Sequence, residues 1–258
     1  MAISIIYCMN YKIEGNGDVL LFIHGLSDNL FYWEVLSAHL KKDYTVIRVD
    51  LRGHGESELG SEEISINSYV DDLKCLLEEL NLKNVNLIGF SLGGAISLDF
   101  TIKYPQLVDS LILMSTFFKV DEHSAKMFNE FKKALNGGFD EFFDFMLPLV
   151  LCPDVIGNHK EELEMLKQIS SQSANVEAYI AAVDACLHFD VESGLADIDV
   201  PTLILSGQYD EIFSVDMQKE LQNKIKNSKL IVFENTKHNL LVGKNNEKLI
   251  NIIKKEIK

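Results

Sequence analysis

Short, almost continuously apolar stretches recur along the chain and predict the strands of a buried sheet. A strand covered on both faces needs apolar side chains at successive positions, whereas a strand with one face in water alternates apolar and polar residues. Six stretches are of the covered type: 19–25 (VLLFIHG), 44–50 (YTVIRVD), 84–90 (NVNLIGF), 110–115 (SLILMS), 202–207 (TLILSG) and 229–234 (KLIVFE). Residues 3–14, roughly, are expected to add an antiparallel edge strand or hairpin.

Stretches of helical length separate these strands. Their apolar residues recur at helical spacing, which predicts helices over residues 31–40, 68–80, 92–104, 215–226 and 247–257. In the second of these, a valine and several leucines share one face, and charged residues, Asp72 among them, are expected on the other. Strand alternating with helix predicts an α/β fold with a mostly parallel, doubly wound sheet.

Residues 116–190 interrupt this alternation, because they contain no convincing strand and carry helical patterns rich in large apolar residues. We therefore expect a core formed by residues 1–115 and 191–258, with a helical insertion at 116–190 folded over the sheet. Most of its Phe and Met side chains are expected to pack inside the insertion, and a minority to line an apolar pocket at the carboxyl edge of the sheet. These residues are Phe117, Phe118, Met127, Phe128, Phe131, Phe139, Phe142, Phe143, Phe145, Met146 and Met165.

Composition and charge narrow the classes of partner. The 258 residues are 47% hydrophobic and 24% charged, which suffices for a full core. A formal net charge of -15 argues against binding nucleic acid or an anionic membrane through bulk electrostatics. The first residues have no basic segment and no long apolar run, so we expect neither a signal peptide nor membrane insertion and place the protein in the cytoplasm. The oligomeric state, monomer or homodimer, stays open.

The four cysteines, Cys8, Cys75, Cys152 and Cys186, lie far apart in the sequence. They form no CxxC pair and no Cys/His cluster at zinc spacing, so neither a metal site nor a disulfide framework is indicated. We expect reduced, mostly buried thiols and a protein that needs no metal ion or organic cofactor.

A serine lies between glycines in the stretch GFSLGG, residues 89–94, where a predicted strand gives way to a predicted helix. That context places Ser91 on a tight, strained turn that lifts its hydroxyl above the sheet edge. Gly89 and Gly93 are expected there because larger side chains would collide across the turn. The helix that follows begins next to Ser91, and its amino terminus favours developing negative charge. The pattern predicts a nucleophile elbow.

A serine hydroxyl needs a base to accept its proton and an acid to orient that base. Asp210 follows the strand at 202–207 and His238 follows the strand at 229–234, which gives the chain order Ser, Asp, His. Glu211 is the alternative acid. The alternative bases are His24, His39, His54, His123, His159 and His188. Only His24 and His54 among these follow predicted core strands, and both precede the serine, so position favours His238.

The tetrahedral oxyanion of acyl transfer needs two backbone N–H donors. We expect one from Leu92, the residue after the nucleophile, and the other from Leu26 in the loop after the first covered strand. Because main-chain groups would do this work, the leucine side chains are no obstacle.

Together these residues make the sequence resemble the α/β-hydrolase superfamily over almost its whole length. The matching landmarks are His24–Gly25 with Trp33 downstream, DLRGHGES at 50–57, GFSLGG at 89–94, GQYD at 207–210, and His238. The resemblance implies that the insertion at 116–190 is the superfamily's cap, or lid. It also implies that Arg52, His54 and Ser57 belong to a structured turn and line the pocket only secondarily.

Two positions depart from the superfamily's commonest pattern. Lys237 stands where glycine usually precedes the catalytic histidine, and Phe90 stands where histidine or tryptophan often precedes the serine. Neither removes a catalytic group, although Lys237 is expected to alter the environment of His238.

Within the superfamily, a serine at the elbow argues against haloalkane dehalogenases and epoxide hydrolases, which use aspartate. The GGSWGG elbow of proline iminopeptidases and the HGSGPG loop of many carbon–carbon bond hydrolases are absent. The resemblance therefore implies a carboxylesterase-like serine hydrolase that cleaves an ester or thioester of a small to medium acyl substrate. A slow-turnover ligand-binding or sensor protein is one alternative, and an acyltransferase, carbon–carbon bond hydrolase or perhydrolase is another.

Overall fold

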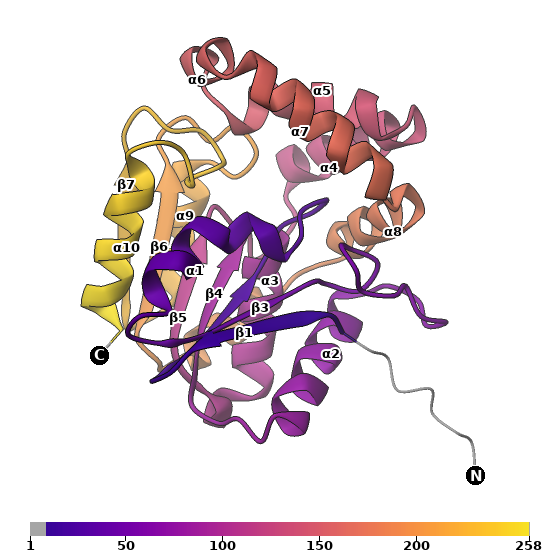
Figure 1. The fold of residues 1–258 in the computed structure, drawn as a ribbon. Helices are drawn as coiled ribbons and strands as arrows, with labels where there is room; N and C mark the ends of the chain where they lie inside the picture. The colour runs from indigo at the N-terminus through magenta and orange to yellow at the C-terminus, as the bar shows by residue number, and fades with distance from the viewer. Residues whose placement is uncertain (1–8, 258) are drawn as a thin grey trace.

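The computed structural model describes residues 9–257, which contain one seven-stranded sheet in the order β1-β3-β2-β4-β5-β6-β7 (Figure 1). The strands are β1 (Tyr11–Gly15), β2 (Val19–Ile23), β3 (Thr45–Val49), β4 (Val85–Phe90), β5 (Val108–Met114), β6 (Thr202–Gly207) and β7 (Ser228–Phe233). β1 pairs antiparallel with β3, and every other pairing is parallel. The predicted α/β fold is confirmed, although residues 3–8 of the expected edge strand lie outside the described residues.

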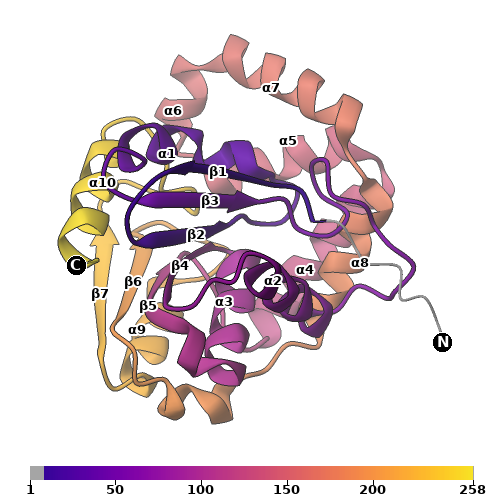
Figure 2. The same cartoon turned by 60° about the horizontal axis from the view of Figure 1, so that its bottom comes forward.

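Helices cover both faces of the sheet (Figure 2). α1 (Glu34–Leu40) and α10 (Asn245–Glu256) pack on one face, and α2 (Ile66–Glu79), α3 (Leu92–Lys103) and α9 (Val215–Lys224) pack on the other. The short 3₁₀ helices are η1 (Leu30–Trp33), η2 (Pro105–Leu107) and η3 (Glu192–Asp197). Along β2, Leu20 and Phe22 pack in the hydrophobic cluster on the α1 and α10 face, and Leu21 and Ile23 pack in the cluster on the α2, α3 and α9 face. Successive residues thus serve opposite faces, which explains the continuously apolar strand sequences.

Helix α2 differs from its prediction in two ways. It begins two residues early because Ser65 and Ser68 form a capping box. Asp72 is buried rather than exposed on the polar face, so that expectation was wrong. The guanidinium of Arg52, from the turn after β3, binds it through Nε–Oδ2 and Nη2–Oδ1 contacts of 2.9 and 2.5 Å.

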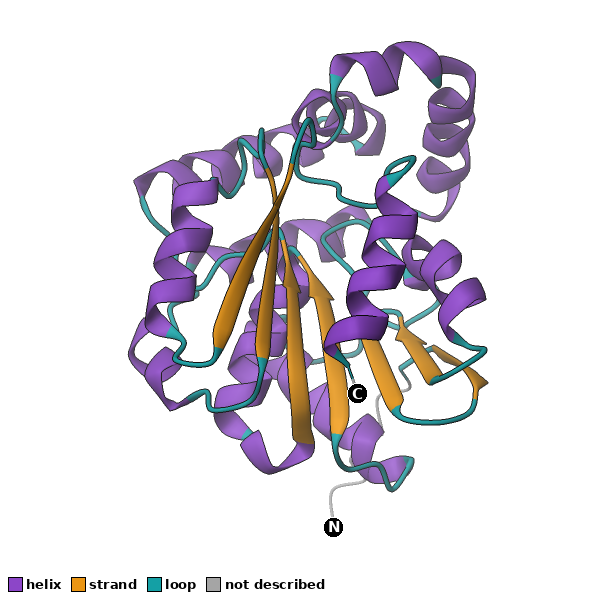
Figure 3. Cartoon of the chain, turned by 90° about the vertical axis from the view of Figure 1, so that its left-hand side faces the viewer, coloured by secondary structure: helices purple, strands orange, loops and turns teal. Residues whose placement is uncertain are grey.

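Residues 116–190, which we call the cap segment, contain five helices above the sheet (Figure 3). They are α4 (Glu122–Asn136), α5 (Phe139–Val150), α6 (Pro153–Asn158), α7 (Lys160–Ser173) and α8 (Val176–Leu187). An antiparallel bridge between Lys119 and Asp190 closes the two ends of the segment. The segment therefore leaves the core and returns to it at one place.

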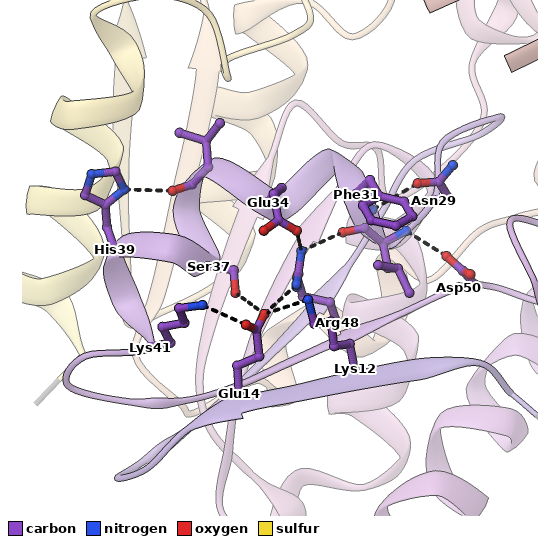
Figure 4. Close-up of polar contacts among 12 residues, drawn as sticks. Lys12, Glu14, Asn29, Phe31, Glu34, Ser37, His39, Lys41, Arg48 and Asp50 are labelled. Atoms are coloured by element: carbon purple, nitrogen blue, oxygen red, sulfur yellow. Dashed lines mark hydrogen bonds and ion pairs between the residues drawn. The ribbon is translucent and has the colours of Figure 1, made fainter. Parts of the chain in front are cut away.

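Arg48 is fully buried in β3, within a stretch predicted to be apolar (Figure 4). Its Nη2 lies 2.6 Å from Glu14 Oε2 in β1, and its Nη1 lies 2.5 Å from Glu34 Oε2 in α1. Lys41 also binds Glu14, and this hydrogen bond, with the charges of Lys12 and Arg48, lowers the pKa of Glu14 to about 2. The buried guanidinium thus ties an edge strand and a helix to β3.

Asp50, at the end of β3, organises the neighbouring loops. Its Oδ1 accepts a hydrogen bond from the Leu30 amide (2.7 Å), and its Oδ2 accepts from Asn10 Nδ2 (2.7 Å) and the Glu56 amide (2.9 Å). The loop between β2 and η1 is thereby fixed at its far end.

No helix within residues 9–257 combines the length and the hydrophobicity required to cross a bilayer.

Candidate active site

The order of the strands determines where the candidate residues meet. β3 lies on one side of β2 and β4 lies on the other, so the connections after β2 and β4 depart in opposite directions. Such a switch point opens a crevice at the carboxyl edge of a parallel sheet. The loop after β2 carries Leu26, and the turn after β4 carries Ser91.

Ser91 has φ 53° and ψ -116°, a conformation that is strained for a residue with a side chain. A Cβ on Gly89 would overlap the Gly93 carbonyl oxygen, and a Cβ on Gly93 would overlap that of Ile23. The turn is held from both sides, because the Ser91 amide donates to Met114 O (2.9 Å) and Thr116 Oγ1 donates to Ser91 O (2.7 Å). Ser91 thus lies on a strand-to-helix turn that tolerates only glycine at both flanking positions.

Asp210 and His238 meet at the ends of β6 and β7. His238 Nδ1 lies 2.9 Å from Asp210 Oδ2, and both side chains are buried. A carboxylate only accepts, so Nδ1 carries the proton and Nε2 is the basic nitrogen. Asp210 Oδ1 accepts from the amides of Ile212 (2.9 Å) and Phe213 (3.0 Å), which fixes the carboxylate. His238 and Ser91 line the same cavity.

Glu211, the alternative acid, turns away from this pair. Its carboxylate lies 2.5 Å from Lys237 Nζ, which also donates to the carbonyl oxygen of Pro148 (2.7 Å) in α5. The lysine that replaces the superfamily's usual glycine therefore contacts the cap segment.

Two further contacts join the His238 loop, residues 235–239, to the end of α5 and to Cys152, two residues beyond it. The Asn239 amide donates to Val150 O (3.1 Å), and Cys152 Sγ donates to Asn235 O (3.4 Å). The last carbonyls of a helix have no partner within the helix. Here the His238 loop supplies donors for two of them.

The two expected oxyanion donors, Leu26 and Leu92, both line the cavity. Leu92 is the first residue of α3, whose opening amides have no partner within the helix. The Leu26 amide makes no hydrogen bond to another group of residues 9–257. Both amides are therefore available to a ligand.

His24 supports the Leu26 loop from beneath. Its Nε2 accepts from the Leu51 amide (3.0 Å), so Nδ1 is the protonated nitrogen and donates to Gly25 O (2.7 Å). Burial lowers the pKa of His24 to about 4, which keeps the ring neutral near pH 7.

The DLRGHGES stretch is structural in this fold. Burial lowers the pKa of His54 to about 3, and its Nδ1 donates to Arg52 O (3.0 Å). Ser57 Oγ donates to Asp50 O (2.6 Å). None of Arg52, His54 and Ser57 lines the cavity. The remaining alternative bases, His39, His123, His159 and His188, are exposed.

The cavity between the sheet edge and the cap segment has a volume of about 170 Å³. Its walls are mainly apolar, and Phe90 faces it next to His238, with ring centroids 5.0 Å apart. The expectation that only a minority of the cap segment's Phe and Met side chains would line a pocket was wrong, because most of them do. They are Phe117, Phe128, Phe131, Phe139, Phe142, Phe143 and Met146.

Asp28 also lines the cavity, two residues beyond Leu26, and the sequence reasoning missed it. Burial raises its pKa to about 7, and the charge of His238 opposes that rise only in part. The available signal was a carboxylate two residues after a predicted oxyanion residue.

No group of three or more His, Cys, Asp or Glu side chains in residues 9–257 is arranged to hold a metal ion. Cys75, Cys152 and Cys186 are free thiols, and only Cys186 is buried. The expectation of mostly buried thiols was wrong for the described cysteines, because Cys75 and Cys152 reach the surface. Cys8 lies outside the described residues.

A family model and known proteins match this chain. A family model described as serine aminopeptidase, S33, matches residues 16–245. The AB hydrolase superfamily protein YisY of Bacillus subtilis (strain 168) is 31% identical over 241 residues, which are 87% of this chain and 86% of YisY.

An uncharacterized protein of Mycobacterium tuberculosis (strain ATCC 25618 / H37Rv) is 39% identical over 109 residues, or 42% of this chain. The match spans only 32% of that relative's length. Among solved structures, a thermophilic esterase from Thermogutta terrifontis, with malate bound, superposes with a TM-score of 0.86 at 26% identity. That match covers 96% of this chain and 92% of the esterase. With the family model spanning most of its length, this chain belongs to the α/β-hydrolase superfamily.

Proposed function

We propose that this protein is a serine hydrolase that cleaves an ester or thioester of a small to medium, mainly apolar acyl group. The observation that carries the proposal is the hydrogen bond of 2.9 Å between Asp210 and His238, in the cavity that Ser91 also lines. The similarity to an esterase from Thermogutta terrifontis supports the same reaction class.

In the acylation step, Ser91 Oγ forms a bond to the substrate's carbonyl carbon while His238 Nε2 accepts the hydroxyl proton. Asp210 holds the imidazole in the required tautomer and stabilises the imidazolium. The carbonyl π electrons move to oxygen, and the amides of Leu26 and Leu92 donate to the resulting oxyanion. The tetrahedral intermediate then expels the alcohol or thiol, which takes the proton from His238, and the acyl group stays on Ser91.

Deacylation repeats these steps with water as the nucleophile. His238 removes a proton from water, the new C–O bond forms, and the Ser91 oxygen leaves with that proton. The acid is released and the serine is restored. The chain's own residues perform each proton transfer.

The cavity supports the choice of acyl group. Its volume of about 170 Å³ can hold on the order of ten water molecules, which corresponds to a small or medium chain. Each methylene buried against its aromatic wall contributes about 0.8 kcal/mol to binding. We therefore expect kcat/KM to rise with chain length until the cavity is full.

The test is a series of p-nitrophenyl esters from acetate to laurate, with Ser91→Ala as the control. A Ser91-dependent optimum at one chain length is the expected result. Equal rates with the wild type and the variant, once circular dichroism shows that both are folded, would remove Ser91 from the mechanism.

The alternatives give different results in the same experiment. A slow-turnover sensor would react with a fluorophosphonate at Ser91 and show negligible turnover across the series. An acyltransferase would release p-nitrophenol faster when an alcohol acceptor is added, and the acylated acceptor would accumulate. The intact Ser, Asp and His set favours an enzyme over a sensor, and the added alcohol acceptor separates hydrolysis from acyl transfer.

A further inference from the structure

The lining of the cavity next to Ser91 is unbalanced in charge. Among the described residues that form it, Asp28 is the one carboxyl group, and neither lysine nor arginine contributes. The other ionisable side chains are Tyr32, Cys186 and His238. An apolar cavity adapted to hydrocarbon alone would place an apolar side chain where Asp28 lies, because burying a carboxyl group without a partner costs several kcal/mol.

The backbone holds Asp28 in place on both sides. Its amide donates to Gly25 O (3.3 Å), which closes a turn through Leu26 and Ser27. On the other side the Asn29 side chain accepts from the Phe31 amide (2.9 Å), which caps η1. The carboxyl group is therefore presented to the cavity by a rigid loop, two residues beyond the proposed oxyanion donor.

No hydrogen-bond partner within the described part of the chain satisfies this carboxyl group. No hydrogen bond to it exists within residues 9–257. The Tyr32 hydroxyl, which also belongs to the lining, is already committed, since it donates to Asn239 Oδ1 (3.1 Å). Asp28 Oδ2 lies 3.3 Å from the position that a Cβ on Gly25 would occupy, so glycine leaves room for it. Asp28 retains accessible surface because it faces the cavity, yet burial has the largest influence on its pKa.

Resting on the proposed function, we propose that Asp28 is a specificity-determining residue that binds an ammonium group of the substrate close to the scissile carbonyl. The substrate class is then an acyl ester or thioester whose acyl chain carries a basic amine. A cation returns the most stabilisation to an otherwise unpartnered carboxylate, and its N–H groups supply the missing donors. An acyl chain that ends in a carboxylate meets the same charge as Asp28 and finds neither lysine nor arginine among the described residues of the lining.

Three esters of nearly equal size isolate this effect: the methyl esters of β-alanine and of butanoic acid, and the monomethyl ester of succinic acid. They share the ester group and two methylenes, and they end in an ammonium, a methyl and a carboxylate group. We expect kcat/KM for the ammonium ester to exceed that for the butanoate by roughly 10- to 100-fold, the range of a charge-assisted hydrogen bond. The succinate monoester should be the poorest substrate.

Asp28→Asn keeps the shape and removes the charge. It should bring the ratio of ammonium ester to butanoate close to one and improve the succinate monoester. Asp216→Asn, which changes the same charge at a side chain 89% exposed, is the matched control and should leave the ratio as in the wild type. A ratio near one in the wild type, or the same preference in Asp28→Asn, overturns the assignment.

Binding separates this inference from the proposed function. Calorimetry with Ser91→Ala measures the affinity for the three esters without turnover, and the double variant with Asp28→Asn should lose the preference. Preferred binding of the ammonium ester to Ser91→Ala, with no Ser91-dependent turnover in the wild type, would uphold Asp28 and overturn the hydrolase proposal. Equal affinities for the ammonium and methyl ends, with normal butanoate hydrolysis, would do the reverse.

Discussion

Replacing Asp28 with asparagine is expected to stabilise the folded protein, and to do so more as the pH rises. Burial raises the pKa of this carboxyl group from 3.8 in the unfolded chain to about 7 in the folded protein. The folded state therefore binds the proton more tightly. The loss of stability from ionising Asp28 in the folded protein is absent below pH 3.8, grows as the pH rises, and is complete above about pH 7.

The magnitude follows from the same two values. Between pH 5 and pH 8.5 the unfolded chain is already ionised, and the folded protein loses its proton near pH 7. The free energy of unfolding of the wild type therefore falls over the two pH units between pH 5 and about pH 7. At about 1.36 kcal/mol per unit, the loss is about 2.7 kcal/mol. This is an upper figure, because water in the cavity screens part of the charge. Asp28→Asn carries no titrating group there and escapes the loss.

Urea unfolding at the two pH values measures the effect. Trp33 is the chain's one tryptophan and is fully buried, so its fluorescence reports on the core, and circular dichroism provides a second probe of the transition. His24 and His54 also titrate on unfolding, but they do so in both proteins and cancel in the difference. We expect the free energy of unfolding of Asp28→Asn to gain up to about 2.7 kcal/mol relative to the wild type between pH 5 and pH 8.5. A difference independent of pH would show that Asp28 ionises as it does in water, and the argument for a desolvated carboxyl group would fail.

Three further changes test other parts of the site. Asp210→Asn should lower kcat by about 10⁴-fold. Glu211→Gln should lower kcat by less than about tenfold, because the Glu211 carboxylate binds Lys237 and not His238. Rates on the best p-nitrophenyl ester test this, and the opposite order would move the acid role to Glu211. Gly93→Ala should lower the free energy of unfolding by about 3 kcal/mol, because its Cβ would overlap a main-chain oxygen. Gly157→Ala, in open space within α6, should raise it by about 0.5 to 1 kcal/mol. Equal melting temperatures for the two variants would contradict this interpretation of the turn. Lys237→Met should lower the free energy of unfolding by about 1 kcal/mol through the lost bond to the cap segment, and an unchanged urea midpoint would show that this contact contributes nothing.

The strands and the placement of Ser91, Asp210 and His238 could be predicted because each depends on local pattern. Continuous apolar stretches identified the strands, although β7, at the edge of the sheet, is only partly buried rather than covered on both faces. The positions just after β4, β6 and β7 located the three side chains. Parallel strands bring their carboxyl ends to one edge, so residues far apart in the sequence could be placed together without knowing any side-chain contact.

Other features depend on contacts that no local pattern reveals. Arg48 lies in an apolar stretch and is buried only because Glu14 and Glu34 reach it from other elements. Asp72 has the spacing of a solvated helix face, yet the turn after β3 places Arg52 against it. Burial of a charged side chain is decided by its partner, and that partner is known only once the fold is formed.

The cap segment shows the same limit for apolar residues. Helical periodicity indicates which side of a helix avoids water, but an apolar side chain avoids water equally well inside a helical cluster or in the wall of a cavity. Which of the two applies depends on how α4 and α5 sit above the sheet. The sequence therefore predicted a pocket without predicting how much of the cap segment would line it.

The contacts between the end of α5 and the His238 loop have a consequence for protein engineering. Exchanging the caps of related hydrolases is an obvious way to transplant substrate preference, with residues 116–190 as the unit to move. In this protein that unit includes the end of α5, which accepts hydrogen bonds from Lys237 and Asn239, the two neighbours of His238. A chimera that imports a foreign cap and keeps the native residues 235–239 would leave the histidine's own loop without its anchors. The cap segment and the His238 loop should therefore be exchanged together, although they are distant in the sequence.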